Sequence, residues 1–119
     1  MEDIVIPESV TRLNDRVFNR CRSLKKVILP NGLSYIGRDM FRDCRLLEDV
    51  NIPNSLKCIP EDTFKRCKSL KSIMIPKSVK KIEAFAFGDC FMLKEIVFEG
   101  ELEKIDIHQN SFCNCPFKL

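Results

Sequence analysis

The sequence lacks the motifs by which most enzymes are recognised. Its four glycines form no glycine-rich phosphate loop, and neither a serine–histidine–acid order nor a paired carboxylate motif is present. The single histidine, His108, is the only base available to a cysteine nucleophile, and nothing in the sequence orients it. We therefore expect no catalytic residue, no cofactor and no enzymatic activity.

Long apolar runs and a strong charge imbalance are also absent. No apolar run approaches about 18 residues, so we expect no membrane-spanning helix and no membrane partner. A net charge of only +3 does not by itself indicate nucleic-acid binding. The acidic start, Met1-Glu2-Asp3, does not resemble a signal peptide. As written, the chain is expected to be cytoplasmic; if it is a fragment of a longer protein, we expect it to be secreted or surface-exposed.

What the sequence has is a repeat of 23 residues. The repeat is marked by Pro7, Pro30, Pro53 and Pro76, and in the same step by Cys21, Cys44, Cys67 and Cys90. A fixed period of about 20 to 50 residues is typical of a solenoid. The pattern predicts a single domain over residues 1–119, with repeats near 4–26, 27–49, 50–72, 73–95 and 96–119. The last repeat is altered, since Glu99 replaces the proline and Phe112 and Cys115 arrive late, as in many terminal repeats.

Each repeat predicts the same path of the chain. The apolar, mostly β-branched residues before each proline form a strand, which the proline ends because it cannot donate to a ladder. A turn then directs Val10 and Leu13, and their equivalents, into the core. A short helical turn follows and carries the phenylalanines inward: Phe18, Phe41, Phe64 and Phe87. Successive strands are expected to stack about 4.8 Å apart.

The cysteines that follow the period are predicted to be small core residues rather than disulfides. They are Cys21, Cys44, Cys67, Cys90 and Cys115. Their side chains would run parallel along the stack, whereas a disulfide needs convergent Cβ vectors. The total of seven cysteines is also odd, so the ladder favours a reducing compartment.

Two cysteines lie outside this ladder. We expect Cys58 to be exposed, with Lys57, Lys80 and Lys81 nearby to favour its thiolate, although an accidental surface thiol is the simpler interpretation. Cys113 follows His108 and precedes Cys115 in a His-x4-Cys-x-Cys stretch. A zinc site would need a fourth ligand and more usual spacing, so we expect a capping loop and no metal.

The repeat resembles the BspA-like, or treponemal-type, leucine-rich repeat. The resemblance is carried by the IPxSV sequences at 6–10 and 75–79, the Ala86-Phe87 pair, and the CxSL sequences at 21–24 and 67–70. It implies an α/β leucine-rich-repeat solenoid of about five repeats, with a parallel β-sheet on the concave face and short helices and turns on the convex face. It also implies adhesion, surface display or partner binding rather than chemistry, in a family that is often secreted or surface-exposed.

Strand alternation predicts which side chains face outward and are therefore candidates for partner binding. The central outward row is Val5, Ile28, Asn51, Met74 and Val97, and a more polar row beside it is Asp3, Lys26, Asp49, Ser72 and Glu95. An apolar strip with a mostly acidic flank is typical of a protein-binding surface. The alternative is that β-propensity fills a strand with such residues whether or not they bind anything.

A basic stripe offers a second candidate surface. Its residues are Arg22, Arg42, Arg45, Lys65 and Lys68. It could dock an acidic protein, a nucleic acid or a nucleoprotein. A solvated rim of long side chains is the interpretation we favour, because no aromatic residues are interleaved with the stripe and Phe91 interrupts it.

The two ends of the array are expected to differ. The strand over residues 4–6 has no obvious cap, and an exposed strand edge invites pairing with a second copy of the chain. Near the other end, Phe85, Phe91 and Met92 form an apolar patch that Phe117 could cover.

Three functional hypotheses follow from these observations. The first is a non-enzymatic module that binds another protein, of unknown identity, and inhibits or recruits it. The second is a structural fragment of a larger adhesin-like array. The third is a binder of nucleic acid or nucleoprotein through the basic stripe.

Overall fold

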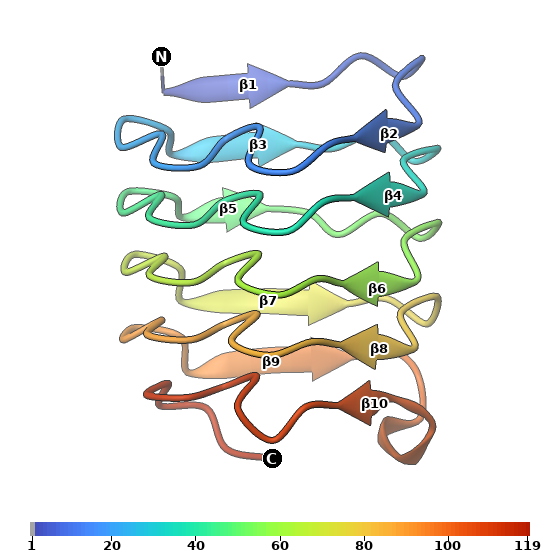
Figure 1. The fold of residues 1–119 in the computed structure, drawn as a ribbon, viewed down its shortest axis with the longest axis vertical. Helices are drawn as coiled ribbons and strands as arrows, with labels where there is room; N and C mark the ends of the chain where they lie inside the picture. The colour runs from blue at the N-terminus through green and yellow to red at the C-terminus, as the bar shows by residue number, and fades with distance from the viewer. Residues whose placement is uncertain (1) are drawn as a thin grey trace.

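The computed structural model describes residues 2–119, which wind into a flattened solenoid measuring 34 × 27 × 20 Å. Each of about five coils contributes two short strands on opposite faces, and Figure 1 shows these strands running in opposite directions. The first-strand face consists of β1 (Asp3–Val5), β3 (Lys26–Ile28), β5 (Asp49–Val50), β7 (Ser72–Ile75) and β9 (Glu95–Phe98). The second-strand face consists of β2 (Arg12–Leu13), β4 (Tyr35–Ile36), β6 (Cys58–Ile59), β8 (Lys81–Ile82) and β10 (Asp106–Ile107).

The first strands confirm the predicted solenoid and its register. Their pairing is parallel, and the 23-residue period places Lys26 opposite Asp3 and Glu95 opposite Ser72. Within each strand the burial alternates, so that Val27 is buried between the exposed Lys26 and Ile28. The sequence therefore predicted correctly which side chains of this face point to the core.

The second-strand face was not predicted, because its residues were assigned to turns. Leu13 and Ile36 lie in β2 and β4, which pair in parallel with each other. The inward direction predicted for Leu13 and its equivalents holds, since Ile36, Ile59 and Ile82 are buried. Strands of two residues are too short to show the alternation by which a strand is recognised.

The short helices expected on the convex side are not formed. The only helix in residues 2–119 is a 3-10 turn at Leu102–Lys104, outside the predicted positions. The segments that carry the phenylalanines are tight turns with left-handed residues, at Arg16, Arg20, Asp39, Asp43, Asp62, Arg66, Phe85, Asp89 and Asn114. Two such residues four positions apart in a coil interrupt a right-handed helix. The backbone N–H groups bond to the next coil instead, as Phe41 N does to Thr63 O at 2.8 Å.

The predicted core ladders are confirmed. The rings of Phe18, Phe41, Phe64, Phe87 and Phe112 stack in one column, with centroids 5.2–5.5 Å apart. Beside them, the thiols of Cys44, Cys67 and Cys90 each donate to a phenylalanine carbonyl of the preceding coil, as Cys44 Sγ does to Phe18 O at 3.0 Å. All seven cysteines are free thiols.

The C-terminal end is covered by an aromatic cluster. Phe117 lies edge-on against Phe112 at 5.4 Å and beside Phe98 at 6.3 Å, and its backbone N–H donates to Leu93 O. Phe117 therefore covers the end of the core and not the predicted apolar patch, where Phe91 stays half exposed.

The N-terminal end has no comparable cover among residues 2–119. Both β1 and β2 are edge strands of their sheets. Ile4, Val10 and Cys21 are only partly buried, whereas their equivalents in the central coils are buried. Within residues 2–119, the core of the first coil is therefore more exposed than that of the central coils.

Both faces are interrupted at the third coil. Strand β5 does not pair with β7, and β4 does not pair with β6, and Figure 1 shows that these two spacings are wider than the others. Pro60 has no N–H to donate at the position where Gly37, Glu83 and His108 donate to the coil before them. The turns that carry the phenylalanines still bond across this level, as Asp39 N does to Glu61 O. Only the pairing of the strands is lost there.

No helix within residues 2–119 has the length and apolar character needed to span a bilayer.

Candidate functional site

The apolar row predicted on the first-strand face points outward as expected. The exposed fractions are 68% for Val5, 42% for Ile28, 53% for Met74 and 47% for Val97, and Asn51 is also exposed. Val5, Ile28, Met74 and Val97 lie on paired strands, whereas Asn51 follows the end of β5. We call this row the apolar strip.

The polar row beside the strip is exposed along its whole length. It consists of Asp3, Lys26, Asp49, Ser72 and Glu95. Lys26 Nζ lies 3.7 Å from a carboxylate oxygen of Asp49, so the one cation of the row is paired. The flank of the strip therefore carries a net negative charge.

Asn51 gives the strip its one polar member and a specific structural role. Its side-chain Oδ1 accepts a hydrogen bond from Leu29 N at 2.7 Å, and its Nδ2 donates to Leu29 O at 2.9 Å. The side chain thus takes the place of a backbone partner for Leu29 where β5 ends early. A hollow of about 370 Å³ opens beside it, bounded also by Met74 and Glu99.

Two cations of the predicted basic stripe are paired with carboxylates. Arg42 Nη1 lies 3.3 Å from Asp62, and Arg45 Nε lies 3.9 Å from Asp43. The ammonium groups of Lys65 and Lys68 lie over phenylalanine rings at 5.0 Å and 5.9 Å, in cation–π contacts. Arg22 is exposed, so the stripe does not present a continuous row of unneutralised cations.

The partners of these arginines form an acidic ladder that the sequence analysis missed. Asp39, Asp43 and Asp62 are buried left-handed residues of the turns, and one oxygen of each has no hydrogen-bond partner. Burial raises the pKa of Asp62; the charges of Lys65 and Arg42 offset this in part, and the Asp39 carboxylate adds to it. The available signal was that Asp39 and Asp62 stand one period apart in the sequence.

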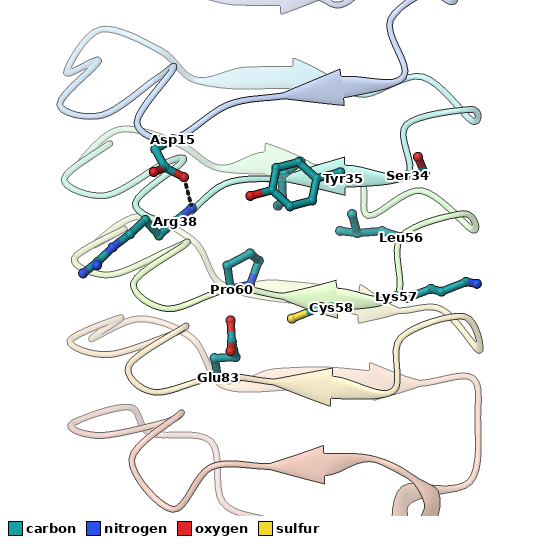
Figure 2. A pocket seen from close by; sticks show the side chains of 10 residues that line it. Asp15, Ser34, Tyr35, Arg38, Leu56, Lys57, Cys58, Pro60 and Glu83 are labelled. Carbon is teal, nitrogen blue, oxygen red and sulfur yellow. Dashed lines mark hydrogen bonds between the residues drawn. The ribbon is translucent and has the colours of Figure 1, made fainter.

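A groove on the second-strand face lies over the interruption between β4 and β6. Its volume is about 410 Å³, and Figure 2 shows Tyr35, Pro60 and Cys58 along its floor. Asp15, Arg38 and Glu83 lie at the turn end, and Lys57 at the other end. Because the second-strand face was not predicted, none of these residues was proposed as a binding surface.

Cys58 lies in this groove and does not behave as predicted. It is partly buried rather than exposed. Burial, and then the carboxylate of Glu83, raise the pKa of its thiol to about 11, and Lys81 opposes this only weakly. The neighbouring lysines therefore do not produce a thiolate near neutral pH.

The residues considered for zinc do not converge. His108 Nδ1 accepts a hydrogen bond from Asn110 N at 3.0 Å, while the buried Cys115 donates to Leu93 O at 3.4 Å. Within residues 2–119, no three histidine, cysteine or acidic side chains cluster as metal ligands would.

Comparison with solved structures finds leucine-rich repeat proteins. The chain is similar to a leucine-rich repeat protein of Bacteroides ovatus, at 27% identity with a TM-score of 0.74, over 81% of this chain and 33% of that one. It is also similar to a leucine-rich cell surface protein of Faecalibacterium prausnitzii, at 25% identity with a TM-score of 0.77, over 96% of this chain and 35% of that one. A third similar structure is a leucine-rich repeat protein of Treponema pallidum. It has 26% sequence identity and a TM-score of 0.75, over 82% of this chain and 52% of that one. The chain thus spans about a third to a half of these proteins.

A search of curated proteins finds no match. In contrast, the model of the BspA type leucine-rich repeat region matches residues 1–118 in six copies. The chain therefore belongs to the BspA-type leucine-rich repeat family.

Proposed function

We propose that the protein is a non-enzymatic module that binds another protein through the first-strand face. The observation that carries this proposal is the apolar strip: four large apolar side chains stand exposed in a row on a sheet. Exposed apolar rows with a polar flank are typical of protein interfaces. The relatives support a binding role in general terms, since one of them is described as a cell surface protein.

The strip has the physical properties of an interface centre. Burying a side chain such as Ile28 or Met74 contributes about 1.5–3 kcal/mol. The hollow between Asn51 and Met74 can receive a side chain of the partner, and central pockets of this kind commonly hold the residues that dominate affinity. The acidic flank favours a partner whose rim is basic.

The proposal is tested by the double substitution Ile28→Glu and Met74→Glu. The immobilised protein captures partners from an extract of its natural source, and quantitative mass spectrometry compares the captured proteins. We expect at least one protein to be retained by the unaltered chain and lost by this variant. The fold should persist, because both side chains point away from the core; circular dichroism checks this.

The matched control replaces Arg22, Arg45 and Lys68 with glutamate on the basic stripe. This control should keep the partner. If the control loses the partner while the strip variant retains it, the basic stripe is the interface and the proposal is wrong.

A second role, as one segment of a longer repeat array, is supported by the coverage of the relatives. Each of the three solved relatives is about two to three times longer than the region they share with this chain. The open first coil presents strand edges on which a further coil could stack. Sequencing of the intact transcript tests this role, and a transcript without further repeats would contradict it.

A further inference from the structure

The groove between β4 and β6 has backbone hydrogen-bond acceptors without partners. In the other coils the carbonyls at these two positions accept an N–H from the next coil, as Thr11 O accepts from Ser34 N and Leu13 O from Gly37 N. The equivalent carbonyls of the second coil are Ser34 O and Ile36 O, and no N–H within residues 2–119 reaches them. Pro60 replaces the expected donor to Ile36 O, so the groove is lined by two backbone acceptors that no N–H within residues 2–119 occupies.

The carboxylates of the groove also outnumber the cations that are free to pair with them. Arg38 is engaged with Asp39 at 3.8 Å and with Glu61 at 2.6 Å, and Figure 2 shows Arg38 and Lys57 extending away from Tyr35 in opposite directions. Asp15 and Glu83 bring two carboxylates to the same end. Asp15 has no ion pair in the described chain, and Glu83 has only Lys81, at 3.9 Å.

The floor of the groove suits a planar cation. Tyr35 is about two-fifths exposed and already holds the guanidinium of Arg12 over its ring, at 4.0 Å. A guanidinium stacks on aromatic rings and presents five N–H donors in a plane, whereas an ammonium is a compact point charge. A volume of about 410 Å³ is within the usual range for a ligand site.

From these observations we propose that the groove is a binding site for an arginine side chain carried by a partner protein. The guanidinium would donate to the unpaired carbonyls of Ser34 and Ile36 and to the carboxylates of Asp15 or Glu83. Its aliphatic part would pack on Tyr35 and Pro60. The site lies on the face opposite the apolar strip, so it does not depend on the function proposed for that strip.

The test uses N-acetyl-arginine amide as the probe, titrated into the labelled protein and followed by nuclear magnetic resonance of the backbone amides. We expect shifts that saturate at residues 34–38 and 57–61. N-acetyl-citrulline amide has the same shape without the charge and should bind about tenfold more weakly, because charge-assisted hydrogen bonds are the stronger kind. N-acetyl-lysine amide should also bind more weakly, since it lacks the planar fork.

Three variants locate the binding. Glu83→Gln and Asp15→Asn should each weaken the arginine probe several-fold while keeping the shape of the groove. Pro60→Gly restores an N–H opposite Ile36 O, and it should weaken the probe by occupying that carbonyl. Glu103→Gln, an exposed carboxylate outside both faces, is the matched control and should leave the affinity unchanged.

Two results would overturn the proposal. One is equal affinity for the arginine, lysine and citrulline probes, which would mean that the groove does not recognise a guanidinium. The other is a set of shifts that lies outside residues 34–38 and 57–61 or that Glu83→Gln and Asp15→Asn leave unchanged. The circular dichroism spectrum of each variant confirms that a loss of binding is not a loss of fold.

Discussion

At the scale of the residue, the phenylalanine column is the main source of packing. Phe64 is the central ring, with Phe41 and Phe87 stacked on its two sides at 5.4 Å and 5.2 Å. Its side chain is almost fully buried. In a solenoid each coil contacts only its neighbours, so a defect in the middle coil weakens two interfaces at once.

We therefore expect Phe64→Ala to lower the free energy of unfolding by about 3–5 kcal/mol. Urea denaturation monitored by circular dichroism measures the change. Ile28→Ala is the matched control, because this side chain points outward and its truncation should cost much less. Equal effects of the two substitutions would contradict the assignment of inward and outward positions.

The buried thiols make the fold sensitive to alkaline pH. Burial raises the pKa of Cys44 to about 12 and that of Cys58 to about 11, from an ordinary value near 9.0. A group whose pKa is raised by folding stabilises the fold fully below its unfolded pKa, and this contribution is lost as the pH rises toward the folded pKa. Each such thiol should therefore lower the stability by about 1.4 kcal/mol per pH unit above about pH 9.

Urea denaturation between pH 7 and 10.5, in the presence of a reductant, tests this pH dependence. Cys44→Ala removes one of the ionising thiols. Above pH 9, the variant should therefore lose about 1.4 kcal/mol less stability per pH unit than the unaltered chain. The comparison between variant and unaltered chain cancels the titration of lysines and of Tyr35. An unchanged slope would show that Cys44 is not protected from ionisation.

At the scale of the element, the hydrogen-bonded pairing between strands is interrupted on both faces at the third coil. Strand β5 pairs with β3 but not with β7, and β6 pairs with β8 but not with β4, while the turns bond across both interruptions. Pro60 accounts for the interruption between β4 and β6, and Asn51 marks the point where β5 ends. Asn51 directs its side chain to the backbone of Leu29, and Pro60 lacks the N–H that the ladder needs.

Hydrogen exchange should detect these interruptions. The amides of Lys57 and Ser72 have no acceptor within residues 2–119, whereas their equivalents Lys80 and Glu95 donate to Lys57 O and Lys71 O. We expect Lys57 and Ser72 to exchange at least about tenfold faster than Lys80 and Glu95, because local opening is easiest where backbone bonds are missing. Equal protection of the two pairs would mean that the ladders are continuous in solution.

At the scale of the whole molecule, the ends differ in how they meet solvent. The C-terminal end is covered by Phe117, while β1 and β2 remain open edges above a partly buried first coil. Open strand edges with exposed apolar residues favour pairing between chains. This asymmetry is the physical basis for proposing self-association through the first coil.

We expect the isolated chain to associate as its concentration rises, and light scattering measures the mass. Replacing Val5 with lysine should reduce the association, because a charged side chain on an edge strand discourages pairing. The same change at Val97, in the fifth coil, is the control and should have little effect. A constant monomeric mass over the whole concentration range would contradict the proposal.

The sequence alone determined the solenoid, its register and its core. A period of 23 residues, kept by proline and cysteine through four coils, leaves few alternatives, and strand alternation then assigns Ile28 outward and Val27 inward. These features depend on residue types repeated many times, so each repeat supports the others. The same repetition made the phenylalanine and cysteine ladders predictable.

The tertiary structure alone decided the second-strand face, the turns and the groove. Two-residue strands such as β4 and β6 exist because the neighbouring coil supplies hydrogen bonds, which local sequence does not show. The left-handed residues replace the expected helices because alternate N–H groups of these segments, such as those of Phe41 and Asp43, bond to the next coil. The groove lies where Pro60 departs from the repeat, and the effect of this departure appears only when adjacent coils are stacked.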